Sequence, residues 1–198
     1  MRIQIAKWIV MLCALALPHA VLAQSSVSNS TVFMSIMSQG GPIEGEVTTQ
    51  GRQGWHKLLA FSHEIISPRD SASGLPTGKR QHTPFKIVKL INKGTPTLLN
   101  SMVGNNVLVN IEVSIWSPAA GGAETKVLTY RLVNAYVASI RPWMPNKGDP
   151  SAQTYPPAEE ITFTYQRIEV VYENGAIFAQ DEWTPNNADS TKSAAPKR

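Results

Sequence analysis

The chain has 198 residues, a formal net charge of +4 and a single cysteine, Cys13. One cysteine excludes an intrachain disulfide framework and any metal site built from several thiolates. The length suits a single domain, and the net charge is too small to indicate nucleic-acid binding by itself.

The N-terminus has the pattern of a secretory signal peptide covering residues 1–23. Two basic residues precede an apolar run at 8–17 (WIVMLCALAL), and Val21 and Ala23 occupy the −3 and −1 positions of a cleavage site before Gln24. Ten apolar residues are too few to span a bilayer as a helix, so no stable membrane insertion is expected. A periplasmic or secreted protein is therefore predicted, with an uncleaved anchor or a misassigned start as the alternatives.

A long loop at 67–78 is followed by a basic run at 78–96, GKRQHTPFKIVKLINKGTP, which has no acidic residue. Within it, lysines alternate with apolar residues from Phe85 onward, which predicts a strand with its apolar side chains inward and Lys86 and Lys89 outward. No stacking aromatic residue except Phe85 accompanies the charges, so binding to nucleic acid is only a weak alternative.

One short helix is predicted directly after this strand. Thr95 suits its N-cap, Pro96 suits its first position, and Gly104 suits the residue that stops it. Four apolar residues have the spacing of one helical stripe: Leu98, Leu99, Met102 and Val103.

Strand patterns dominate the second half of the chain. Residues 107–116 alternate strictly, with Val109, Ile111 and Val113 on the predicted inner face. The apolar pattern at 127–140 is long for one strand and predicts a bend or bulge near Asn134.

Residues 161–172 contain a change of parity. Ile161 and Phe163 share one face, whereas Ile168 and Val170 share the other, which predicts a bulge near 166–167 or a strand that enters a second sheet environment. The sequence ENG at 173–175 then predicts a hairpin with a type I′ turn. Residues 184–198 are polar and predicted to be disordered.

These patterns predict a mainly β fold: one antiparallel domain of roughly eight strands with one short flanking α-helix, arranged as a barrel or a closely packed pair of sheets. The domain is expected to cover residues 24–183.

Sequence motifs give no positive indication of catalysis or of a cofactor. His56 and His63 are seven residues apart, so on a strand they face opposite sides, and a shared metal would require a bend. Ser62 precedes His63 without a nucleophile elbow, and the carboxylates at 159–160 should also diverge. An enzyme that uses these two histidines and His82 is the least favoured hypothesis.

Several segments together resemble the haemolysin-coregulated protein (Hcp) family, the tube subunit of type VI secretion systems. The segments are GKRQHTPFKIVKLINKGTPTLLNSMVG (78–104), EEITFTYQRIEVVYENG (159–175) and the closing DEW (181–183), in the order of the family. The resemblance extends from about Val32 to Trp183.

The resemblance implies a β-barrel of two packed sheets that assembles into hexameric rings, without enzymatic activity or a cofactor. In the family, rings stack into a tube inside a contractile sheath, the tube is expelled with its spike, and small effector proteins ride in its lumen. The segment 67–84 corresponds to an arm that reaches a neighbouring subunit. The predicted interface residues are Arg69, Lys79, Arg80, His82 and Phe85.

The signal peptide departs from this family pattern, because tube subunits polymerise in the cytoplasm without a cleavable leader. The alternative prediction is therefore an exported periplasmic binding or adaptor module on the same fold.

Overall fold

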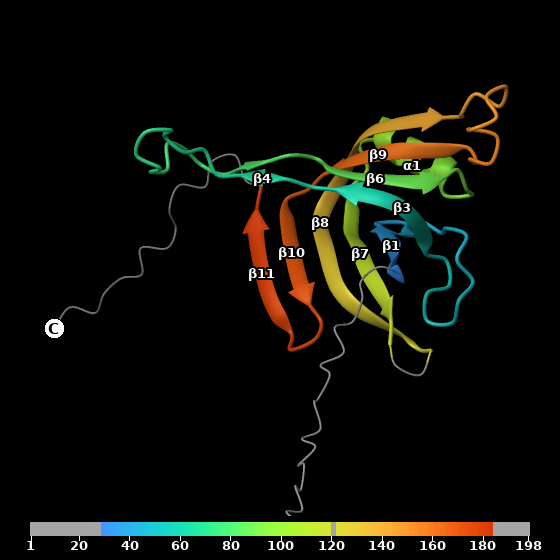
Figure 1. Cartoon of the computed structure of the whole chain (residues 1–198), viewed down its shortest axis with the longest axis horizontal. Helices are drawn as coiled ribbons and strands as arrows, with labels where there is room; N and C mark the ends of the chain where they lie inside the picture. The colour runs from blue at the N-terminus through green and yellow to red at the C-terminus, as the bar shows by residue number, and fades with distance from the viewer. Residues whose placement is uncertain (1–28, 120–121, 184–198) are drawn as a thin grey trace, which may run out of the picture.

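The computed structural model describes residues 29–119 and 122–183, which form a closed antiparallel barrel with one helix and a projecting arm (Figure 1). The predicted leader (1–23) and polar tail (184–198) lie outside the described residues. The barrel closes in the order β8-β7-β1-β3-β6-β9, with β9 pairing back to β8. Its strands are β1 (Thr31–Ser38), β3 (His56–Ser62), β6 (Phe85–Leu90), β7 (Leu108–Pro118), β8 (Glu124–Trp143) and β9 (Ala158–Thr164). The prediction of a β-barrel with one flanking helix is confirmed.

Strand β8 closes the barrel because it changes its partner along its length. Its first half, up to Val133, pairs with β10 (Arg167–Tyr172), whereas its second half, from Tyr136, pairs with β9. Asn134 lies between the two halves with a φ of 50°, and the ribbon of β8 is strongly curved (Figure 1). The bend predicted near Asn134 is confirmed.

The parity change in residues 161–172 marks a break between two strands. β9 ends at Thr164 and β10 begins at Arg167, and the Gln166 amide donates to the Val133 carbonyl across the gap (3.1 Å). The segment therefore leaves the barrel wall and continues into an extension of the sheet, as the sequence predicted.

Strand β10 pairs with β11 (Ile177–Glu182), which lies at the end of the sheet order, so the predicted hairpin is confirmed. Its turn differs from the prediction. The positive φ angles belong to Gly175 (95°) and Ala176 (50°), not to Asn174, because four residues rather than two connect Tyr172 to Ile177.

The start of β7 also differs from the strict alternation of its sequence. Ile111 and Val113 are buried as predicted, but Leu108 is fully buried and Val109 is exposed. The register with β1 shifts at this point, so that Ser38 lies opposite Leu108 while Met37 lies opposite Asn110. This extra residue turns the first side chains of the strand to the other face.

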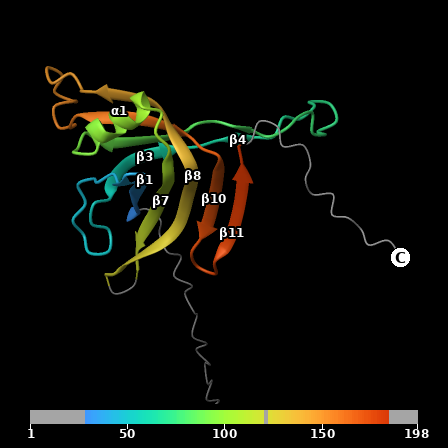
Figure 2. The same ribbon diagram turned by 180° about the vertical axis from the view of Figure 1, so that it is seen from behind.

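Helix α1 (Thr95–Val103) covers one end of the barrel and contacts β8 (Figures 1 and 2). Leu98 is fully buried and Met102 packs partly against the core. Leu99 and Val103 are exposed, so the predicted four-residue stripe is wrong for these two residues. Only the side of the helix that faces the barrel packs against the core.

The predicted N-cap of α1 is corrected, whereas the helix stops at Gly104 as predicted. Gly94 is the N-cap, and Thr95 is already helical, where its hydroxyl donates to Glu159 Oε1 (2.7 Å) instead of capping the backbone. At the C-terminal end Gly104 has a φ of −81°, and the left-handed residue is Asn105 (φ 48°).

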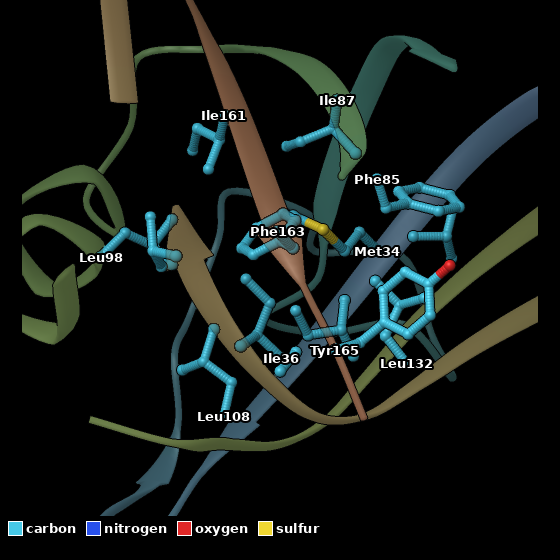
Figure 3. Close-up of a cluster of buried hydrophobic side chains, with 14 of the residues drawn as sticks. Met34, Ile36, Phe85, Ile87, Leu98, Leu108, Leu132, Ile161, Phe163 and Tyr165 are labelled. Atoms are coloured by element: carbon cyan, nitrogen blue, oxygen red, sulfur yellow. The ribbon is translucent and has the colours of Figure 1, made fainter. Parts of the chain in front are cut away.

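The barrel interior is filled by apolar side chains from all six strands and from α1 (Figure 3). The labelled members of this core are Met34, Ile36, Phe85, Ile87, Leu98, Leu108, Leu132, Ile161, Phe163 and Tyr165. Tyr165, which follows β9, lies at the edge of this cluster and brings a hydroxyl to it.

The segment between β3 and β6 forms a narrow arm that projects away from the barrel (Figures 1 and 2). The strands β4 (Ile65–Ile66) and β5 (Gln81–His82) pair at its base, and Arg69 bridges to Pro76 further out. Residues 69–81 of the arm are exposed. The long loop predicted at 67–78 is thus the outer part of a hairpin. Strand β2 (Gly41–Pro42) pairs only with β1.

Candidate functional site

The base of the arm is fixed to β11 by a two-point ion pair. Arg80 donates from Nε and Nη2 to the two carboxylate oxygens of Asp181, each at 2.6 Å. The Arg80 side chain is 63% exposed, whereas Asp181 is 21% exposed. A cleft of about 660 Å³ lies here between the arm and β11, and Lys79, Arg80, His82 and Asp181 are among its lining residues. The arm is therefore held where it leaves the barrel.

Beneath this ion pair, two histidines meet the hydroxyl of Tyr165. His82 Nδ1 lies 2.8 Å and His63 Nε2 lies 2.6 Å from the Tyr165 oxygen. The other ring nitrogen of His82, Nε2, lies 3.2 Å from Asp181 Oδ2. A chain of polar contacts thus connects β11, the arm base and the barrel, and we call Asp181, His82, Tyr165 and His63 the arm-base chain.

Aromatic rings enclose the arm-base chain. Trp183 stacks on His82 with ring centroids 5.9 Å apart and meets Tyr165 edge-on at 5.2 Å. His63 stacks on Phe85 at 5.3 Å. This packing leaves the His82 side chain only 3% exposed, so this predicted interface residue is buried at the arm base.

The surroundings shift the ionisation of three members of the chain. Burial raises the pKa of Tyr165, and the Asp181 carboxylate adds to this effect. Burial alone would raise the pKa of Asp181, but hydrogen bonds and charge from Arg80 outweigh burial and lower it. Burial, then the proximity of His82, lowers the pKa of His63. Near neutral pH the chain therefore contains a carboxylate, a neutral phenol and a neutral His63.

The structure separates the five predicted interface residues into two groups. Arg69, Lys79 and Arg80 are exposed on the arm, where Arg69 also donates to the Gly74 carbonyl (3.1 Å). Phe85 is fully buried in the core and His82 is enclosed at the arm base. These two side chains support the arm from within and offer almost no surface to another subunit.

A second polar cluster lies inside the barrel below α1, and it corrects the prediction that Lys89 faces outward. Lys89 and Glu159 are directly opposite on β6 and β9, both fully buried, with Lys89 Nζ 2.6 Å from Glu159 Oε1. Lys89 also donates to the Leu90 carbonyl (3.1 Å) and to Asn92 Oδ1 (2.9 Å). All three ammonium protons therefore have acceptors.

His56 belongs to the same buried cluster. It contacts the Ile43 carbonyl through Nε2 (3.0 Å), and Asn92 Nδ2 donates to its Nδ1 (3.2 Å). These contacts fix a neutral tautomer, and burial, the largest effect, lowers the pKa of His56. His56 is therefore far from the arm-base chain in both position and role, and the three histidines do not form one site.

The adjacent carboxylates Glu159 and Glu160 diverge as predicted. Glu159 points inward to Lys89, whereas Glu160 lies outside, 3.2 Å from Lys86. Within residues 29–119 and 122–183, no group of three or more potential metal ligands was found. Among these residues, no helix is long and apolar enough to cross a membrane. The polar clusters of this chain thus join secondary-structure elements to one another.

Comparison with known proteins identifies the family. The family described as "Type VI secretion system effector, Hcp" matches residues 33–172. The chain belongs to the Hcp family. The match includes the arm and ends at Tyr172, so β11 with Asp181 lies beyond it.

Individual Hcp-related proteins agree with this membership. The "Major exported protein" of Pseudomonas aeruginosa is 31% identical over 139 residues, covering 70% of this chain and 81% of that protein. A mutant of the Hcp1 protein from E. coli EAEC 042 is 27% identical with a TM-score of 0.69, covering 78% of this chain and 99% of that one. The secreted protein Hcp3 from Pseudomonas aeruginosa shares the fold, with 22% identity, a TM-score of 0.63 and coverage of 78% and 99%.

Proposed function

We propose that this Hcp protein is a ring-forming tube subunit of a type VI secretion system, that its rings are hexameric, and that its barrel has a structural rather than an enzymatic role. The observation that carries this proposal is the arm, which projects from the closed barrel with its outer part exposed (Figure 1). The described part of one subunit leaves residues 69–81 of this arm exposed, whereas a neighbouring copy in a ring would cover them. The sheath, the spike and small effectors are the further partners that we propose.

Exposed apolar side chains support an interface at both the arm and β11. Leu75 at the arm tip and Ile177 on β11 are about two-thirds exposed, and Phe178 is more than half exposed. β11 is also the end strand of its sheet, so one row of its backbone groups is available for pairing. Apolar surface next to an open strand edge is typical of a contact between proteins. We therefore propose Arg69, Lys79 and Arg80 as interface residues, with His82 and Phe85 supporting them.

Arg80→Glu is expected to weaken ring assembly while the barrel stays folded. The new carboxylate would face Asp181 in place of the guanidinium, and this repulsion should displace the arm base from β11. Because the ion pair is at the surface of the fold, its loss should affect the position of the arm more than barrel stability. We expect the concentration required for assembly, measured by native mass spectrometry, to rise at least about tenfold.

Lys93→Glu is the matched control for this prediction. Lys93 forms an exposed ion pair with Glu44 at 2.6 Å, away from the arm. Charge reversal there should leave the ring population unchanged. Rings that persist unaltered in Arg80→Glu would show that the arm base is not part of the interface.

As the second candidate function we propose an exported Hcp adaptor outside the tube, with residues 1–23 removed before Gln24. The leader pattern supports this proposal, and so does the relative named "Major exported protein". Sequencing the mature N-terminus in separated cell fractions tests it. A periplasmic form beginning at Gln24 would favour the second candidate function, an exported Hcp adaptor outside the tube, and an intact cytoplasmic form would favour the tube subunit.

A further inference from the structure

The Tyr165 hydroxyl has one proton but two imidazole neighbours. His82 Nδ1 and His63 Nε2 both lie within hydrogen-bond distance of its oxygen, at 2.8 and 2.6 Å. The hydroxyl can donate to only one of these nitrogens, so the other must carry a proton and donate to the oxygen. The protonation of His63 and that of His82 are therefore linked through Tyr165.

When both histidines are neutral, the hydrogen bonds to the Tyr165 hydroxyl can be made in the following arrangement. His82 would carry its proton on Nε2, toward Asp181, and would accept the Tyr165 proton at Nδ1. His63 would then donate from Nε2 to the Tyr165 oxygen. The Tyr165 oxygen and the two ring nitrogens that face it are then complementary. The buried Nε2 of His82 makes no hydrogen bond in the structure, but it faces the Asp181 carboxylate at 3.2 Å.

One added proton reverses the direction of the chain without breaking it. If His82 carries the added proton, the charge lies next to the Asp181 carboxylate, which is 3.2 Å from Nε2. His82 then donates to the Tyr165 oxygen from Nδ1, and the Tyr165 hydroxyl donates to His63 instead. All contacts remain complementary, and the new charge is next to an opposite charge.

A second proton cannot be accommodated in the same way. Both imidazoles would then donate to the Tyr165 oxygen, and the hydroxyl proton would lose its acceptor. Two cations would also face one another across a single oxygen atom in a partly buried site, where like charges repel strongly. The chain as built tolerates one proton and is disrupted by two.

We propose that the arm-base chain is a proton-sensitive latch that holds the arm on the barrel near neutral pH and releases it when both His63 and His82 are protonated. His63, before β4, and His82, on β5, lie on the two sides of the arm base, whereas Tyr165 follows β9 and Asp181 lies on β11, so separation of these groups would free the arm base. The latch belongs to a single subunit; its effect on assembly rests on the proposed ring.

Other charged groups near the chain do not replace this pairing. Arg80 is engaged with both Asp181 oxygens. Glu64 and Lys86 line the cleft beside His63, and Glu182 lines the cleft beside Asp181. The effect that opposes a charge on His63 is therefore burial together with the proximity of His82.

The direction of the pH dependence follows from His63. Its pKa is lowered in the folded protein from the ordinary value of 6.5, so the unfolded or open form binds the proton more tightly. The stability that the latch gives is complete above about pH 6.5 and is lost as the pH falls from there through the lowered pKa.

Hydrogen exchange of the arm-base amides tests the latch on the full chain. The Thr83 amide, which donates to the Glu64 carbonyl (3.0 Å), joins the two sides of the arm base beside His82 and His63, and it reports whether these sides separate. After correction for intrinsic exchange, its protection should fall below pH 6.5 by up to about tenfold per pH unit, the slope of one proton. His63→Gln should abolish this fall in protection, because the variant keeps only one of the two imidazoles that must be protonated for release. Glu64→Gln, the control beside it, should keep the wild-type fall.

NMR titration of the imidazoles in the unmodified protein provides a second measurement. Loss of Thr83 protection should follow the protonation of His63. Protection that does not change with pH, or that still falls in His63→Gln, would overturn the latch. Native mass spectrometry of the same samples separates the two proposals: rings with pH-independent protection contradict only the latch, and a monomer with the predicted fall contradicts only the ring.

Discussion

Replacing Lys89 with methionine is expected to lower the free energy of unfolding by about 3–5 kcal/mol. The substitution would leave Glu159 fully buried with no cation, because the 2.6 Å contact to Lys89 Nζ is the only ion pair of its carboxylate among the described residues. The hydroxyl of Thr95 would remain as a donor to Oε1, but one neutral hydrogen bond does not replace a charge partner. Urea unfolding at neutral pH measures the effect as a lower midpoint at unchanged m-value.

The same two strands provide a matched control. Lys86 and Glu160 form a partly exposed ion pair on the outer face of β6 and β9, at 3.2 Å. Lys86→Met should cost less than about 1 kcal/mol, because exposed pairs contribute little. The double variant Lys89→Met with Glu159→Met should regain most of the loss, since no uncompensated charge remains. A double variant no more stable than Lys89→Met alone would show that the pair itself, rather than an unpaired charge, determines stability.

The features that were predicted correctly depend on residues that are close together in the sequence. The bend at Asn134 and the break before Arg167 follow from the parity of apolar side chains along one stretch of chain, which local geometry imposes. The barrel follows from many such strands in one domain. Their order required pairing between distant segments, and the sequence pattern does not contain that information.

Lys89 shows where local reasoning gave the wrong answer. It shares parity with Phe85 and Ile87, both fully buried, so the strand pattern itself places it inside the barrel. The outward prediction assigned Lys86 and Lys89 to one solvent-facing side of the strand, although residues three apart on a strand face opposite sides. Its partner Glu159 is distant in sequence and could be found only from the pairing of β6 with β9.

The contacts of the candidate site could not be predicted from the sequence for a similar reason. The basic run at 78–96 contains Arg80 and His82, but the partners of these two residues could not be assigned from the sequence. Tyr165 is 83 residues from His82, and Asp181 is 101 residues from Arg80. The sequence DEW contained a weak signal. Its carboxylate, Asp181, lies on β11, and its aromatic ring, Trp183, comes two residues later, directly after that strand.

Phe85→Ala is expected to destabilise the isolated subunit by about 3–5 kcal/mol. Phe85 is fully buried at the start of β6, where it stacks in parallel on Phe61 (5.7 Å) and contacts Tyr130 at a tilt (5.7 Å). Truncation would leave a cavity in a closed barrel, whose hydrogen-bonded wall cannot collapse easily around it. It would also remove the ring on which His63 stacks. Thermal or urea unfolding of a dilute, monomeric sample measures the loss.

Two further variants show whether this loss comes from the core or from an interface. Phe85→Leu keeps much of the buried volume and should cost less than Phe85→Ala, about 1.5 kcal/mol. Phe178→Ala, on the exposed face of β11, should change subunit stability by less than about 0.5 kcal/mol. If the monomeric Phe85→Ala variant kept full stability but no longer assembled, Phe85 would contribute to the contact between subunits instead of to the core. The expected pattern is the reverse of Arg80→Glu, because a buried side chain stabilises the fold before assembly, whereas an exposed charge at the arm base acts on the position of the arm.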